Sequence, residues 1–202
     1  LIGLVGSEMC IRDRYSIDNL SGIIDRAIKN KIPMLALFPN INKKLKDING
    51  SEALNEDNLV SKAIIKIKKK YKNKIGIMCD VALDPYTSHG HDGLIDKKEI
   101  LNDKTIQILI KQSLLQAQMG CDVIAPSDMM DGRIGEIRRA LDKNGYEKIQ
   151  ILSYAVKYSS SFYGPFRDAV GSKKALKGDK KTYQMDFSNI DEALREVALD
   201  IK

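Results

Sequence analysis

The sequence has few cysteines, no long apolar run and no glycine-rich turn, and each absence narrows the class of protein. Its three cysteines, Cys10, Cys79 and Cys121, show no CxxC spacing and no disulfide framework, which indicates a reducing compartment, the cytoplasm. No apolar run approaches the roughly 20 residues that span a bilayer, so we expect no membrane segment. No expected strand leads into a glycine-rich turn, which argues against a dinucleotide or P-loop site.

The composition is that of a globular protein, with 43% hydrophobic and 30% charged residues in 202. The net charge of +6 is mild, and residues 66–74 (KIKKKYKNK) carry much of it on a helical pattern. This pattern indicates a solvated helix end, so we expect no nucleic-acid partner. Residues 1–14 (LIGLVGSEMCIRDR) follow no clean helical or strand period and lack the n-region and length of a signal peptide. We expect them to be a non-native cloning or sequencing artefact, and residues 15–202 to form the catalytic domain.

From residue 15 onward, helical and strand patterns alternate. Apolar spacing predicts helices at about 16–28, 55–70, 102–119, 132–143 and 190–202, with strands at 33–38, 75–81, 121–125, 149–157 and 182–185. This alternation predicts an α/β fold with a parallel sheet and helical crossovers.

Polar residues lie at or after the ends of three of these strands. Asp80 lies at the end of strand 75–81 and Asp84 follows it, Ser127 and Asp128 follow strand 121–125, and Lys157 ends strand 149–157. Enzymes with a TIM (β/α)₈ barrel assemble their sites in this way, which favours a barrel over an open sheet. A full barrel needs eight strands and about 250 residues, whereas this sequence offers about five strands and stops inside a helix. We therefore expect an incomplete TIM (β/α)₈ barrel whose C-terminal strands are missing.

Lys157 ends the run 151–157 (ILSYAVK), in which bulky apolar side chains alternate with small or polar ones. Taken locally, the pattern favours a strand-end lysine that reaches solvent. The alternative is an amine nucleophile in a confined pocket, where burial favours the neutral amine that forms a Schiff base with a carbonyl. The loops on either side of this strand favour the nucleophile.

Three loops carry the other candidate residues. Residues 78–94 hold Asp80, Asp84, Asp92 and two histidines, a set that fits either a metal site or a metal-free polar loop, and both remain open. In residues 125–134 we expect Asp131 to cap the next helix and Asp128 to face the barrel mouth. Residues 158–181 form a long loop, typical of a lid, whose aromatic and cationic residues suit a substrate with a ketone and a carboxylate.

Four strings in this order, DVALDPYTSHGHDG, APSDMMDGRI, KYSSSFYGPFRDAVGS and KTYQMD, resemble the porphobilinogen synthase (5-aminolaevulinic acid dehydratase) family. The resemblance runs from about residue 15 to residue 202. It implies a lyase with a TIM barrel that condenses two molecules of 5-aminolaevulinate into porphobilinogen, an early step of tetrapyrrole (haem and chlorophyll) biosynthesis. The family uses two Schiff-base lysines and is commonly a homo-octamer.

The resemblance also implies roles for individual residues. Lys157 matches the first Schiff-base lysine; Asp80, Ser127 and Asp128 match polar residues around the reacting amino groups; Phe166, Arg167, Lys180 and Gln184 match positions that bind the substrate and its carboxylate. The second Schiff-base lysine would lie on a later strand, which this sequence does not reach. We therefore expect the chain alone to be inactive.

One departure from the family concerns the metal. Zinc-using members carry cysteines at the positions of Ala82, Asp84 and Asp92, so the soft thiolate ligands are missing and we expect no catalytic zinc. The resemblance implies a magnesium-responsive type, with Glu196 near an allosteric Mg²⁺ and with Asp84 and Asp92 as further metal candidates. Two alternatives stay open: a non-catalytic remnant or oligomerisation partner, and another Schiff-base barrel such as a class I aldolase. An aldolase needs no second lysine, but it leaves the aspartate-rich loop and the cationic lid unexplained.

Overall fold

The centre of the molecule is a sheet of parallel strands that are joined by helices. The computed structural model describes residues 2–3, 14–97, 99–160, 163 and 180–202. The strand order is β2-β1-β3-β4-β7-β8, and the strands β3 (Met34–Pro39), β4 (Gly76–Val81), β7 (Val123–Pro126) and β8 (Gln150–Ile151) are parallel. Two short strands, β1 (Ile2–Gly3) and β2 (Arg14–Tyr15), extend the β3 edge in antiparallel pairing.

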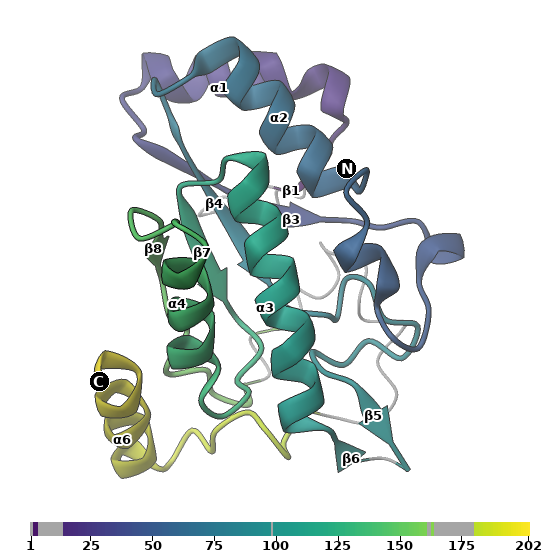
Figure 1. Ribbon diagram of the computed structural model, residues 1–202, viewed down its shortest axis with the longest axis vertical. Coiled ribbons are helices and arrows are strands. Elements are labelled where there is room, and N and C mark those ends of the chain that lie inside the picture. Colours follow the sequence, from purple (N-terminus) through teal and green to yellow (C-terminus); the bar gives the residue numbers. More distant parts are fainter. Residues whose placement is uncertain (1, 4–13, 98, 161–162, 164–179) are drawn as a thin grey trace.

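Helices make each crossover between the parallel strands. The helices are α1 (Leu20–Lys29), α2 (Leu59–Tyr71), α3 (Asn102–Met119), α4 (Arg133–Lys143) and α6 (Ile190–Ile201). Three short 3₁₀ turns, Ile17–Asn19, Lys43–Leu45 and Ser51–Leu54, and a hairpin of β5 (Ile95–Asp96) and β6 (Glu99–Ile100) lie in the connections. Helices α3 and α4 pack side by side on one face of the sheet (Figure 1). In the part of the chain described here, no helix is both long and apolar enough to cross a bilayer.

The core lies between the sheet and these helices. Ile64 of α2, Ile77 of β4, Leu109 of α3 and Ile137 of α4 are at most 1% exposed and belong to one continuous apolar cluster. Burial of each such side chain contributes on the order of 1.5–3 kcal/mol. The core therefore fixes the helices against the sheet, and with them the loops at the carboxyl ends of the strands.

Glycine residues end or start two of the helices. Gly120, with φ of +102°, ends α3 as the sequence predicts. Gly132 (φ +79°) precedes α4, which has no side-chain cap, so the prediction that Asp131 caps this helix is wrong. Asp131 instead exchanges hydrogen bonds with Asn102, which lies inside α3 rather than capping it.

The end of the sheet near β8 differs most from the sequence prediction. Strand β8 covers two residues of the predicted strand 149–157, although the amides of Leu152 and Tyr154 still donate to β7 carbonyl oxygens at 2.9 and 3.3 Å. No other described strand pairs with the far side of β8, and Leu152 is 44% exposed. Residues 182–185 form a turn with one isolated parallel bridge, between Met185 and Tyr158, so the strand predicted there is wrong.

Candidate active site

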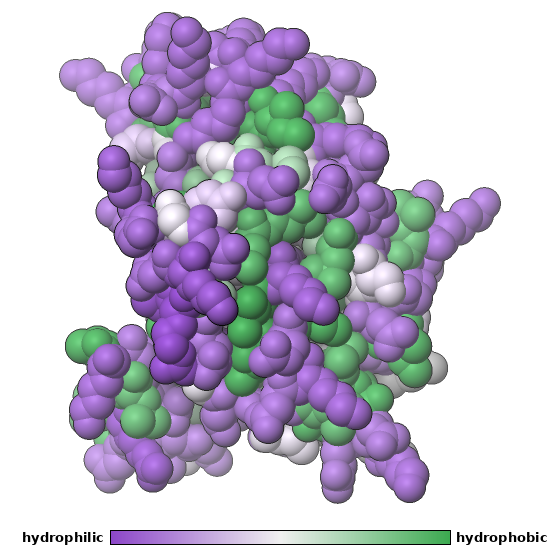
Figure 2. Space-filling view, in the orientation of Figure 1, coloured by the Kyte–Doolittle hydropathy of each residue, from purple (hydrophilic) through white to green (hydrophobic). Residues whose placement is uncertain are grey.

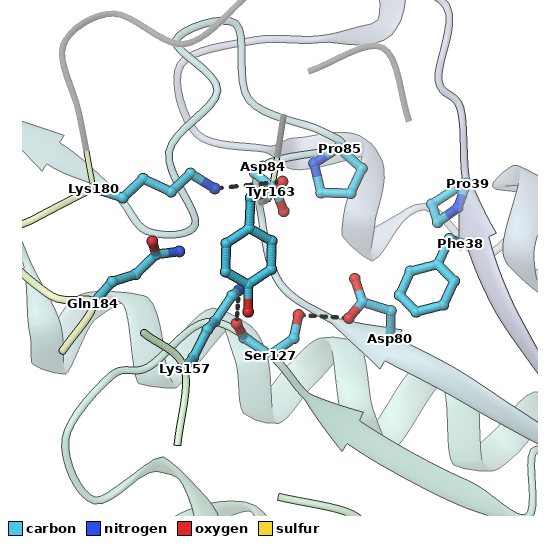
Figure 3. A pocket seen from close by; sticks show the side chains of 10 residues that line it. All are labelled: Phe38, Pro39, Asp80, Asp84, Pro85, Ser127, Lys157, Tyr163, Lys180 and Gln184. Atoms are coloured by element: carbon cyan, nitrogen blue, oxygen red, sulfur yellow. Dashed lines mark hydrogen bonds and ion pairs between the residues drawn. The ribbon is translucent and has the colours of Figure 1, made fainter. Parts of the chain in front are cut away.

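A cavity of about 40 Å³ lies at the carboxyl ends of β4, β7 and the chain that continues β8 (Figure 3). Most of the predicted site residues line it: Asp80, Asp84, Ser127, Lys157, Lys180 and Gln184. Parallel strands place their carboxyl ends at one edge of the sheet, so residues that are far apart in sequence meet there. Ligand pockets typically reach about 300–1,000 Å³, so side chains have to move to admit a substrate.

Lys157 points into this cavity rather than toward solvent. Its side chain is 12% exposed, its Nζ donates a hydrogen bond to the backbone oxygen of Ser127, and its Nζ lies 3.6 Å from Asp92 Oδ2. The local preference for a solvated lysine is therefore wrong. The physical reason is that the chain beyond β8 still bonds to the end of β7, which brings Lys157 beside Ser127.

A second lysine shares the same carboxylate. Lys180 Nζ donates to Asp92 Oδ1 and lies 3.6 Å from Asp84 Oδ2, and the Asp92 side chain is fully buried. Burial favours the neutral form of Asp92, but the nearby charges of Lys157 and Lys180 outweigh burial and hold its pKa below the ordinary value. Asp92 is therefore an ionised anchor for two lysines.

The pKa of Asp80 shifts in the opposite direction. Burial, together with the neighbouring Asp84 carboxylate, raises the pKa of Asp80 to about 7, although the Ser127 hydroxyl donates to its Oδ1 at 2.5 Å. Burial also raises the pKa of Asp84, despite the charge of Lys180. A carboxyl group that titrates near neutral pH can accept or release a proton during a reaction.

Asp128 does not line the cavity, contrary to the expectation that it faces the barrel mouth. It is fully buried behind Ser127, where its Oδ1 lies 3.2 Å from Arg133 Nε and its Oδ2 accepts from the amide of Met130 at 2.8 Å. Burial raises its pKa to about 6, although Arg133 acts in the other direction. The sequence analysis did not single out Arg133, although a buried carboxylate requires a cation of this kind.

The two histidines of the loop 78–94 make contacts within the protein. His91 Nδ1 lies 3.2 Å from the hydroxyl of Tyr183, and the amide of His91 donates to His89 Nδ1 at 3.2 Å. Among the described residues, no group of three or more His, Cys, Asp or Glu is placed to hold a metal ion. The two interpretations of this segment, a metal site and a metal-free polar loop, both stay open. Tyr163, one of the aromatic residues predicted to pack the loop 158–181, also lines the cavity, as does Phe38, for which the sequence predicts no role.

The remaining predicted residues lie elsewhere. Glu196 is on α6, in a groove also lined by Asp131, Glu192 and Asp200, and burial together with the charges of Asp131 and Asp200 raises its pKa. Phe166 and Arg167 fall outside the described residues, so their roles stay predictions.

Comparisons with known proteins agree on one family. The family model described as delta-aminolevulinic acid dehydratase (ALAD) matches residues 7–202. The delta-aminolevulinic acid dehydratase of Bradyrhizobium diazoefficiens is 58% identical over 189 residues, covering 94% of this chain and 53% of that protein. The chloroplastic enzyme of Glycine max is 48% identical over 190 residues, covering 92% of this chain and 46% of that protein.

A solved structure is similar as well. The crystal structure of the Toxoplasma gondii ME49 enzyme in complex with its reaction product porphobilinogen has a TM-score of 0.90 and 44% identity, covering 93% of this chain and 54% of that one. The likeness, with the four parallel strands, confirms the predicted incomplete barrel. The chain spans about half the length of the curated relatives it matches. The family match begins at residue 7, and the assignment of residues 1–14 as non-native stays a prediction.

Proposed function

The chain belongs to the delta-aminolevulinic acid dehydratase family, and on that premise we propose that it is part of a longer porphobilinogen synthase, the full-length parent. The parent condenses two molecules of 5-aminolaevulinate into porphobilinogen. The observation that carries this proposal is the largely buried Lys157 side chain, which the chain beyond β8 places in one cavity with Asp80 and 3.6 Å from Asp92 Oδ2.

The first chemical step uses Lys157 as the nucleophile. The Lys157 ammonium group, which pairs with Asp92, first releases a proton to a carboxylate of the cavity, and the neutral amine then attacks the ketone carbon of one 5-aminolaevulinate. The proton passes to the former carbonyl oxygen, which leaves as water, and a protonated Schiff base forms. Water formation needs a proton transfer, and Asp80 suits this because its pKa is raised by burial to about 7. The hydrogen bond from the Ser127 hydroxyl orients Asp80 toward the same cavity.

The substrate carboxylate binds at Lys180 and Gln184, which lie across the cavity from Asp80 (Figure 3). The Lys180 ammonium group pairs with Asp84 and Asp92. An entering carboxylate competes for this ammonium group, and a shift of Lys180 toward the substrate also enlarges the cavity. The family resemblance implies that Arg167 also binds this carboxylate and that Phe166 contacts the substrate.

Chemical trapping on the full-length parent tests the proposal. Sodium borohydride reduction in the presence of 5-aminolaevulinate is expected to leave a stable adduct on the peptide that contains Lys157, detected by mass spectrometry. Lys157→Met should lose the adduct and the activity, whereas the surface variant Lys62→Met should keep both, since the Lys62 side chain is 53% exposed. An unmodified Lys157 peptide in an enzyme that turns over contradicts the assignment.

We also propose that the parent is zinc-independent and responds to magnesium. No thiolate is available at Ala82, Asp84 and Asp92, and Lys180 already neutralises the two carboxylates. Carboxylates line the groove around Glu196, and Mg²⁺ is commonly held by one or two carboxylates with several waters. Bound there, the ion would supply a charge that steadies α6 rather than a reacting group.

The metal proposal has a direct measurement. Activity of the parent should survive a zinc-selective chelator and rise with added Mg²⁺, and Glu196→Gln should weaken the magnesium response while sparing activity at saturating Mg²⁺. Loss of activity under the chelator with rescue by zinc contradicts it. We further propose that the parent is a homo-octamer, which the family resemblance implies. Its compartment is the cytoplasm in this proposal, because the described cysteines, Cys79 and Cys121, are free and buried as in a reducing compartment.

A further inference from the structure

Tyr183 joins two parts of the active site that lie far apart in sequence. Its hydroxyl lies 3.2 Å from His91 Nδ1 and accepts a hydrogen bond from the backbone amide of Asp92 at 3.4 Å. The contacts cross 91 to 92 positions of the chain. Tyr183 thus links the turn that carries Lys180 and Gln184 to the loop that carries Asp92.

The turn around Tyr183 is attached to the nucleophile's strand on its other side. The amide of Met185 donates to the carbonyl oxygen of Lys157 at 3.1 Å, and the amide of Ser159 donates to the carbonyl oxygen of Met185 at 2.8 Å. Residues 180–185 therefore connect the loop that carries Asp92 with the chain around Lys157 that continues β8. The Tyr183 ring packs on both the main core and the small apolar cluster of Met129, Met185 and Ala193.

We propose that Tyr183 is a positioning residue whose hydroxyl latches residues 180–185 onto the Asp92 loop and so holds Lys180 and Gln184 at the carboxylate end of the cavity. The inference rests on the proposed function for its kinetic consequence only. Its structural part, the latch, stands on the contacts of Tyr183 themselves.

The loop that carries His91 and Asp92 has further hydrogen bonds that do not involve Tyr183. His89 Nδ1 accepts from the amide of His91, so its Nε2 carries the proton and donates to the carbonyl oxygen of Ile48 at 3.3 Å. The Thr87 hydroxyl donates to the carbonyl oxygen of His91 at 3.0 Å. These bonds hold the loop at His89 and His91, next to the amide of Asp92 that donates to the Tyr183 hydroxyl.

A latch predicts a loss of substrate affinity rather than of chemistry. Removing a hydrogen bond of this kind weakens the held state by roughly five- to tenfold, and Lys180 then spends less time where it meets the substrate carboxylate. Lys157 should be affected less than Lys180, because its amine also donates to the Ser127 carbonyl oxygen, which lies outside the latched segments. The KM for 5-aminolaevulinate should therefore rise by about five- to tenfold while kcat changes less than about twofold.

The first experiment measures the latch without any reaction. Hydrogen exchange on the full-length parent compares wild type with Tyr183→Phe, which keeps the ring and removes only the hydroxyl. The amides of Asp92 and Met185 should exchange faster in the variant, whereas the Ser127 amide, which donates to Val81 within the sheet at 3.1 Å, should be unchanged. Tyr146→Phe, a tyrosine in the turn after α4, is the matched control.

The second experiment is steady-state kinetics on the same variants. A raised KM with a nearly constant kcat, together with faster exchange, supports the proposal, whereas a merely destabilising change would lower the active fraction and leave KM unchanged. Unchanged exchange in Tyr183→Phe overturns the latch, and faster exchange with an unchanged KM overturns its positioning role. If wild-type parent forms no porphobilinogen, the proposed function fails, while the exchange result still decides the latch.

Discussion

Asp80 and Asp92 are both buried carboxylates of the same site, yet their pKa values shift in opposite directions. Two lysines approach Asp92, and their charges outweigh its burial, so its pKa is lowered. Asp80 has a serine hydroxyl as its hydrogen-bond donor, and burial raises its pKa to about 7. One residue is therefore a fixed charge, and the other can exchange a proton at neutral pH.

The raised pKa of Asp80 predicts how stability depends on pH. In the unfolded chain Asp80 titrates near 3.8, and in the folded chain near 7, so the folded state binds more protons between these values. Its contribution to stability is complete below about pH 4 and is lost as the pH rises through 7. The free energy of unfolding of the parent should fall between pH 5 and pH 8, and in Asp80→Asn this fall should be smaller than in wild type by roughly 2 kcal/mol.

Urea unfolding at several pH values checks this prediction. Asp128 and Asp84 also have raised pKa values, so the slope should shrink without vanishing. Asp92, with its lowered pKa, acts below this pH window. Asp57→Asn is the control, because that side chain is 85% exposed; a pH dependence in Asp80→Asn equal to that of wild type contradicts the prediction.

At the scale of elements, one arginine joins the loop before α4 to the strand of the nucleophile. Arg133 pairs with Asp128 and donates to the carbonyl oxygens of Met130 and Tyr154 at 3.1 and 3.3 Å. Tyr154 lies three positions before Lys157 in the sequence. The buried pair therefore sets the separation between Ser127 and Lys157, the two residues whose contact places the nucleophile.

Removing this arginine should be costly. Arg133→Met in the parent leaves the fully buried Asp128 without its cation, and the expected loss of unfolding free energy is about 3–5 kcal/mol. Arg139→Met removes an exposed pair with Glu136 on the same helix and should cost less than about 1 kcal/mol. Denaturant unfolding compares the two variants, and equal losses would show that the buried pair has no special role.

Sequence periodicity predicted the elements that have a strongly one-sided burial pattern. The predicted bounds of α3 and α4 agree with the structure to within a residue or so. The buried side chains of each helix, such as Leu109 in α3 and Ile137 in α4, follow helical spacing, and a glycine follows each helix end. Sequence periodicity also brought Asp80, Ser127 and Lys157 to one edge of a parallel sheet. It failed where tertiary partners decide: nothing local distinguishes Asp128 beside Arg133 from Asp80 in the cavity, or tells that Tyr183 reaches His91.

At the scale of the whole molecule, none of the strands in the described part of the chain pairs with the outer side of β8. Leu152 and Val156 are 44% and 39% exposed, and α6 presents Ile190, Leu194 and Ile201 at 63–80% exposure. Apolar surface is visible over α6 at the lower left of Figure 2. An exposed strand edge beside apolar side chains is a site for association with other chains. The rest of the parent would cover this region if it continues the barrel from β8.

The 202-residue chain by itself should therefore associate and should not form porphobilinogen. Light scattering after size-exclusion chromatography is expected to show species larger than a monomer, and Leu194→Glu with Ile201→Glu should shift them toward the monomer, because charges on α6 oppose apolar contact. Lys62→Glu changes the charge at an exposed position of α2 and serves as the control for charge alone. Porphobilinogen formation by the purified chain would contradict the expectation that later strands complete the site, and a monomer in wild type would show that the open edge is protected within this chain.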